Sequence, residues 1–186
     1  EPVKDIGRTL NQQEAEAEEH KGNYVVQTED GYRRIVAAPQ PEKIVEIDAI
    51  KALSDAGQVV IACGGGGIPV LERDEELIGA SAVIEKDLTS GKLAQALDAD
   101  ELLILTSVER VSVNYNSDTE EQLKEVTAPE MKQYMEENHF EDNTMLPKIQ
   151  ASVEFVEERP GRRAVITSIG KAKEGYLGKT GTIITA

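Results

Sequence analysis

From residue 42 onward, the spacing of apolar residues switches repeatedly between the period of a helix and that of a strand. Isoleucines and leucines at helical spacing predict a helix that begins near residue 44 and ends at Gly57. The next apolar run, residues 59–62, is short and contains no polar side chain, which is typical of a strand buried on both faces of a parallel sheet. A helix therefore leads into a predicted sheet.

The alternation continues toward the C-terminus. A helix is predicted over residues 87–97, with Asp87 as its N-cap, and residues 102–105 form the next apolar strand. Residues 164–167 and 181–184 supply the last two predicted strands. Repeated helix–strand alternation predicts an α/β fold, in which helices flank an open, mainly parallel sheet as a three-layer sandwich.

Two further helices are predicted from residues typical of helix starts and stops. Thr127 and Glu130 have the spacing of a capping box, in which each side chain binds the other residue's backbone amide, so a helix through residue 135 is expected. Another helix is expected to begin near Thr144 and to end at Arg159, just before a proline and a glycine.

Residues 1–41 have a different character, with an acidic stretch and few large apolar side chains. We expect a short Glu- and Ala-rich helix capped by Thr9 or Asn11, followed by two strands joined by a turn at Asp30–Gly31. The sequence thus predicts a small peripheral α+β subdomain over residues 1–41 and an α/β core over residues 42–186.

Charge and composition narrow the function. The chain carries 20 Lys and Arg against 35 Asp and Glu, a net charge of −15, which disfavours nucleic-acid and membrane-surface partners. One cysteine and two histidines exclude a disulfide framework and predict no metal cluster, and they fit a reducing cytoplasm. The first residue is not Met, which suggests that part of the protein is missing upstream.

The most specific local motif is a run of four glycines, Gly64, Gly65, Gly66 and Gly67, directly after the predicted strand at residues 59–62. Glycines let consecutive amides turn toward an anion such as phosphate, at the sheet edge where α/β proteins bind ligands. The alternative is a flexible turn. The loop lacks the spacing of both the Walker motif and the dinucleotide fingerprint, so any cation for a phosphate must come from elsewhere in the chain.

Two lysines are candidates for that cation. Lys86 lies at the start of the predicted helix over residues 87–97, and Lys148 lies in the first turn of the helix that begins near Thr144. A cation is disfavoured at a helix N-terminus unless an anion shares the place. The alternatives are a solvated surface ion pair for Lys86 and a positional accident for Lys148. His139 is interpreted as a helix cap and Cys63 as a packing residue.

Several motifs occurring in one order resemble the carbamate kinases of the amino acid kinase superfamily. They are the glycine run continuing to Ile68–Pro69, Ala82–Asp87 (Ala-Val-Ile-Glu-Lys-Asp), Leu103–Thr106 and Met145–Lys148 (Met-Leu-Pro-Lys). The resemblance covers essentially all 186 residues, but the first two fifths of the family's pattern is absent. It implies a nucleotide-binding part with a protruding, lid-like subdomain over residues 1–41, and a homodimer formed through the missing part.

The resemblance also implies an activity and its residues. The enzyme would transfer a phosphoryl group reversibly between ATP and carbamate, forming ATP from carbamoyl phosphate and MgADP in arginine breakdown. Lys4, Lys86 and Lys148 would contact the transferred group, with Asp87 orienting the lysines, and the glycine run would face the phosphates. The adenine and ribose pocket would contain Thr106, Val108, Val113, Tyr115, Met145 and Leu146.

Two other functions remain open at this point. One is another enzyme of the superfamily, acting on a carboxylate such as acetylglutamate or on a phosphate such as uridylate. The other is a noncatalytic nucleotide-binding module, which would retain ADP affinity without turnover.

Overall fold

The computed structural model describes residues 2–186, which form two compact units. The first unit combines the N-terminal residues up to Gln40 with Gly65–Glu85, and the second combines Pro41–Gly64 with Lys86–Ala186. The chain passes from one unit to the other after Gln40, after Gly64 and after Glu85. The four-glycine run therefore spans one of these crossings.

The first unit is built on an antiparallel sheet with the strand order β1-β3-β2. The helix α1 follows the first strand, and its N-cap is Asn11, which resolves the two alternatives. The Asn11 side chain accepts a 2.9 Å hydrogen bond from the amide of Glu14, and the Glu14 side chain accepts a 3.0 Å bond from the amide of Asn11. The bounds are β1 Pro2–Leu10, α1 Gln12–His20, β2 Tyr24–Thr28 and β3 Gly31–Ala37.

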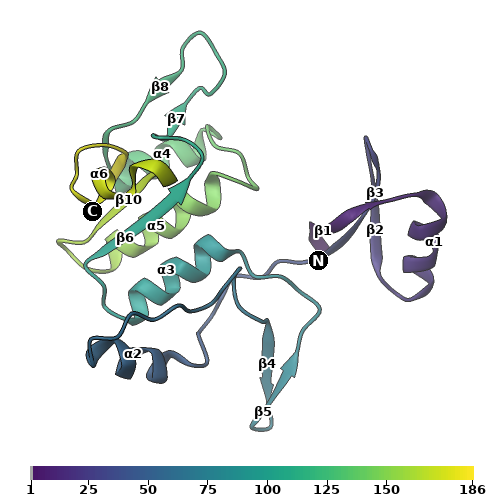
Figure 1. Ribbon diagram of the computed structural model, residues 1–186. Helices are drawn as coiled ribbons and strands as arrows, with labels where there is room; N and C mark the ends of the chain where they lie inside the picture. Colours follow the sequence, from purple (N-terminus) through teal and green to yellow (C-terminus); the bar gives the residue numbers. More distant parts are fainter. Residues whose placement is uncertain (1) are drawn as a thin grey trace. The chain divides into compact units, whose positions relative to one another are not determined.

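Two features of the first unit were not predicted from the sequence. The strand β1 carries no regular alternation of apolar residues, and it is fixed instead by its pairing with β3. The strands β4 (Val70–Arg73) and β5 (Glu76–Gly79) form an antiparallel hairpin (Figure 1). The segment after the hairpin is anchored to the sheet, because the Val83 amide donates a 2.9 Å hydrogen bond to the carbonyl of Ala37.

The second unit contains a four-stranded sheet with the order β6-β10-β11-β9. The pairs β6–β10 and β9–β11 are parallel, and β10–β11 is antiparallel. This confirms the α/β fold with a mainly parallel sheet. The strand bounds are β6 Glu101–Thr106, β9 Glu125–Thr127, β10 Arg163–Ser168 and β11 Thr182–Thr185, and a short pair is formed by β7 Ser112–Val113 and β8 Glu121–Gln122.

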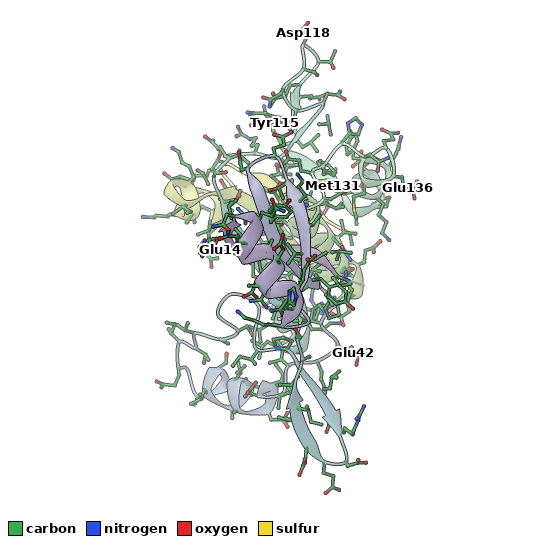
Figure 2. The ribbon with its side chains drawn as sticks, turned by 90° about the vertical axis from the view of Figure 1, so that its right-hand side faces the viewer. Glu14, Glu42, Tyr115, Asp118, Met131 and Glu136 are labelled. Atoms are coloured by element: carbon green, nitrogen blue, oxygen red, sulfur yellow. The ribbon has the colours of Figure 1, made fainter. Side chains whose placement is uncertain are left out.

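Helices cover both faces of this sheet (Figure 1). Ala164 and Ile166 of β10 are fully buried in the main apolar core with the inner face of α5, whereas Val165 and Thr167, on the opposite face, lie against Gly175 of α6. Met131 of α4 is also fully buried, and its place within this unit is marked in Figure 2. The helices are α2 Ile47–Asp55, α3 Lys86–Ala96, α4 Ala128–Glu136, α5 Leu146–Glu158 and α6 Ala172–Tyr176.

The predicted strand over residues 59–62 is wrong, because these residues are not in a strand in the structure. Val59 and Ile61 are 97% and 98% exposed, and none of the described residues forms a strand beside them. An apolar run becomes a strand only where a neighbouring strand accepts its backbone hydrogen bonds. Residues 2–186 contain no strand that pairs with residues 59–62, so the apolar run does not form a strand by itself.

Two smaller corrections concern helices. Asp87 is not the N-cap of α3, because the helix already begins at Lys86 and the Asp87 side chain is buried in its first turn. The helix before residue 59 is α2, which begins at Ile47 rather than near residue 44. Leu53, one of the leucines at helical spacing, is half exposed. The capping box at Thr127 is confirmed.

A buried threonine ties two loops to the sheet and gives a test of the fold. The Thr182 hydroxyl donates a 2.6 Å hydrogen bond to the carbonyl of Leu123 and accepts a 2.9 Å bond from the amide of Val111. We expect Thr182→Val to reduce the free energy of unfolding by about 1–3 kcal/mol, since it keeps the side-chain shape but leaves the buried Val111 amide unpaired.

Urea unfolding measures this effect. Thr185→Val is the matched control, because Thr185 lies on the same strand with an exposed side chain. The control is expected to stay within about 0.5 kcal/mol of the original chain. Equal stability of the two variants would show that the Thr182 hydrogen bonds do not hold the loops.

Candidate functional site

The central feature of the second unit is an ion pair between two helices. The Lys148 ammonium lies 2.7 Å from Asp87 Oδ2, and the two side chains are 10% and 9% exposed. Lys148 is the third residue of α5, and Asp87 is the second residue of α3. A charge so little exposed is held only where a partner compensates for its lost hydration, and each of these two groups compensates the other.

Close packing of α3 on α5 brings these two side chains together. Gly91 lies one turn after Asp87 on α3, and a Cβ added there would sit 3.1 Å from the Cβ of Ala151 and 3.2 Å from its carbonyl oxygen. Ala151 and Ser152 are completely or almost completely buried on the face of α5 that carries Lys148. Small residues on both helices thus allow the approach that makes the ion pair.

Lys86 adds a second ammonium to the same carboxylate. Its Nζ lies 3.6 Å from Asp87 Oδ2, and its side chain is 58% exposed. Asp87 therefore forms ion pairs with two lysines, of which Lys148 is buried and Lys86 is exposed. Both lysines lie at helix N-termini, and the three side chains together carry a net charge of +1. In a chain with a net charge of −15, this local excess of positive charge favours a bound anion.

Lys4, the remaining candidate lysine, lies in the first unit on strand β1. Its ammonium is 3.0 Å from Glu85 Oε2, and the two side chains are 27% and 17% exposed. The structure thus brings Lys86, Asp87 and Lys148 together in one unit and places Lys4 in the other.

The four-glycine run adopts backbone conformations that other residues rarely take. Gly64, Gly66 and Gly67 have φ angles of 46°, 134° and 90°, and Cys63 before them has a φ of 62°. The φ angle of Gly65 lies outside this positive range, and a Cβ added at Gly65 would have no atom within 4 Å. The backbone therefore favours glycine at three of the four positions.

The residues expected around adenine and ribose all belong to the second unit. Thr106 ends β6, Val108 follows it, and Met145 and Leu146 begin the helix that carries Lys148. Val113 is part of the apolar core, whereas Tyr115, labelled in Figure 2, is exposed in the loop that leads to Asp118. Thr106, Met145 and Leu146 are half-buried.

Cys63 precedes the glycine run and is half-buried. Burial, and to a smaller extent the negative charge of Glu46, raises the pKa of its thiol. A raised pKa lowers the fraction of nucleophilic thiolate at neutral pH. The local electrostatics therefore do not activate this cysteine.

Two contributors to these clusters were not found from the sequence, namely Gly91 and Glu85. A glycine inside a helix and a glutamate beside a lysine are both ordinary local patterns. Their partners, Ala151 and Lys4, lie 60 and 81 residues away along the chain. The only local signal was the tripeptide Glu85-Lys86-Asp87, which indicated nothing about a partner on strand β1.

Residues 2–186, the range that the structure describes, contain neither a metal-binding cluster nor a membrane-spanning helix. No group of three or more His, Cys, Asp or Glu side chains in this range is arranged to hold a metal ion. No helix in the same range is long and apolar enough to cross a bilayer.

The mainly parallel α/β fold agrees with the class of protein that the family profile identifies. The sequence profile of the amino acid kinase family matches residues 8–168, and the chain belongs to that family.

Named relatives agree with this assignment. The chain is 48% identical to the carbamate kinase-like protein YqeA of Escherichia coli and 46% identical to a carbamate kinase of Clostridium perfringens, each over 185 residues. Each match covers 98% of this chain and 59% of the relative, so the chain spans about three fifths of their length.

Solved structures show the same relationship. The carbamate kinase from Giardia lamblia bound to AMP-PNP superposes with a TM-score of 0.90 at 36% identity, covering 99% of this chain and 59% of that one. A protein from Aeropyrum pernix superposes with a TM-score of 0.91 at 40% identity, covering 99% of this chain and 60% of that one.

Proposed function

We propose that the protein is a carbamate kinase that transfers a phosphoryl group reversibly between ATP and carbamate. The observation that carries this proposal is the pair of lysines, Lys86 and Lys148, converging on Asp87 at the N-termini of two helices. The names of the relatives support the choice of carbamate as the phosphoryl acceptor. In the cell the reaction would run in the cytoplasm during arginine breakdown, from carbamoyl phosphate to ATP.

In that direction, a terminal β-phosphate oxygen of ADP forms a bond to the phosphorus of carbamoyl phosphate. The bond from phosphorus to the carbamoyl oxygen breaks, and carbamate leaves with the electron pair. Negative charge spreads over the three equatorial oxygens in the transition state. The Lys148 and Lys86 ammoniums would stabilise that charge, and Lys148 would do so strongly because its surroundings exclude water.

Asp87 would have a positioning role in this scheme. Its carboxylate fixes the end of the Lys148 side chain at 2.7 Å before substrate arrives, so less conformational freedom is lost in the transition state. Lys4 is proposed as the third cation on the transferred group. This role is supported by its place in the family's pattern and by its partly buried side chain, which is 27% exposed.

The nucleotide is proposed to bind in the second unit beside the start of α5. Thr106, Val108, Val113, Tyr115, Met145 and Leu146 are the residues assigned to adenine and ribose. Mg²⁺ would enter with the nucleotide as MgADP or MgATP. The described residues hold no acidic cluster for it, so we assign it no protein ligand.

The carbamate site is proposed to need a segment that residues 1–186 do not supply. The relatives have about two fifths of their length without a counterpart here. We propose that an equivalent segment pairs with the exposed apolar residues Val59 and Ile61, completes the carbamate site and forms a homodimer.

The glycine run allows a matched test of phosphate binding. Gly67→Ala is expected to weaken ADP binding about fivefold to thirtyfold, because a φ of 90° costs a residue with a Cβ about 1–2 kcal/mol. Gly65→Ala is the control, since both positions are sterically open but only Gly67 has a positive φ. Calorimetric titration with ADP compares the two, and equal affinities would show that this backbone conformation does not bind the phosphates.

The experiment that tests the proposed function is a comparison of substrates. The full-length protein is given ADP with carbamoyl phosphate or acetyl phosphate, and separately ATP with acetylglutamate or uridylate. A carbamate kinase is supported if carbamoyl phosphate, and not acetyl phosphate, gives ATP from ADP. Phosphorylation of acetylglutamate or uridylate instead would move the chain to another activity of the family, and ADP binding without any transfer would identify a noncatalytic module.

A further inference from the structure

The ion pair between Lys4 and Glu85 differs from its neighbours in the first unit. Its side chains are 27% and 17% exposed, whereas those of the Arg33–Asp5 pair, which joins β3 to β1, are 35% and 51% exposed. The partners lie 81 residues apart in the sequence, so the contact depends on the fold of the whole unit. Such a pair is better shielded from solvent than an ordinary surface pair.

The sheet of the first unit holds both partners in place. On β1, Lys4 and Ile6 share the half-buried face, while Val3 and Asp5 are exposed. Lys4 is paired with Val36 on β3, and the end of that strand holds the segment before Glu85. There, Ala37 forms a bridge with Ala82 and accepts the hydrogen bond from the amide of Val83. The backbones on both sides of the ion pair are therefore fixed to the same strand.

We infer that Glu85 is a positioning residue for Lys4. A free lysine side chain has many rotamers, and a carboxylate 3.0 Å from its Nζ restricts the ammonium to one place. Glu85 is also peptide-bonded to Lys86, so the residue that orients one candidate lysine precedes the next in the chain. This inference rests on the proposed function, in which Lys4 contacts the transferred phosphoryl group.

The test combines chemical labelling with a double-mutant cycle in the full-length protein. In Glu85→Gln, acetylation of Lys4 by acetic anhydride, followed by mass spectrometry, is expected to be several-fold faster than in the original protein. The kcat for ATP formation is expected to fall about tenfold, as for the loss of one charge-assisted hydrogen bond, with KM for ADP unchanged. Asp5→Asn, which removes the neighbouring ion pair on β1, is expected to change neither quantity.

The decisive comparison is Glu85→Gln in a Lys4→Ala background. If Glu85 acts through Lys4, the added substitution causes no further loss of kcat. A further tenfold loss, or unchanged Lys4 labelling in Glu85→Gln, overturns this inference while leaving the proposed function intact. An original protein that forms no ATP from carbamoyl phosphate overturns the proposed function itself, which is a distinct result.

Discussion

Replacing Lys148 with methionine is expected to lower the turnover of ATP formation about a thousandfold, with the Kd for MgADP changed by no more than a few fold. The ammonium would act on charge that develops only in the transition state, so its loss affects kcat rather than nucleotide affinity. The magnitude is that of removing one preorganised donor or cation from a phosphoryl- or acyl-transfer site.

The same substitution is expected to destabilise the protein, and this effect must be separated from catalysis. Asp87 is 9% exposed, and Lys148→Met removes the partner that lies 2.7 Å from its carboxylate. Breaking a buried pair costs about 3–5 kcal/mol, because a charge is left without compensation. The double variant Lys148→Met with Asp87→Asn leaves no buried charge from this pair, and we expect it to recover most of that stability.

Turnover and urea unfolding, measured together, distinguish the two effects. The double variant is expected to be nearly as stable as the original protein and as inactive as Lys148→Met alone. Recovery of turnover along with stability would show that Lys148 supports only the fold. Full turnover in the single variant would remove Lys148 from the mechanism.

Replacing Lys86 with alanine is expected to lower turnover about a hundredfold without a measurable change in stability. Its side chain is 58% exposed, and Asp87 keeps Lys148 as a closer partner at 2.7 Å, so the substitution leaves no buried charge without compensation. Exposed substitutions of this kind change the free energy of unfolding by about 0.5 kcal/mol or less. The smaller catalytic effect follows from stronger solvent screening around an exposed ammonium.

Lys92→Ala is the matched control, because it makes the same change farther along helix α3. Turnover of the control is expected to remain within twofold of the original protein. If Lys86→Ala and Lys92→Ala were equally active, Lys86 would be a surface ion pair, which was the alternative that its sequence context left open.

Local sequence signals located most elements whose stability is local. The cap at Asn11 and the capping box at Thr127 each depend on residues within a few positions of one another, and both are present. The apolar run of β6 is also a strand, because β10 pairs with it. Residues 59–62 have the same apolar character as β6 but no partner strand within the described chain. The difference between these two runs is tertiary, so no local pattern can reveal it.

The site was predictable in part for a similar reason. Motifs and their family resemblance located Lys86, Asp87 and Lys148, and the structure brings these three together. The local pattern assigned Asp87 to capping, because an aspartate before a helix is a common N-cap, but its partner lies on another helix. Gly91 and Glu85 were missed because their roles depend on contacts with residues far away in the sequence.

The most direct test of the central claim is ATP formation from carbamoyl phosphate and MgADP by the full-length protein, with its Lys148→Met/Asp87→Asn variant beside it. A reaction without protein corrects for spontaneous breakdown of carbamoyl phosphate. The proposed function predicts rapid ATP formation by the original protein and a loss of about a thousandfold in the folded double variant. Absence of ATP with the original protein, or equal rates from the two proteins, would contradict it.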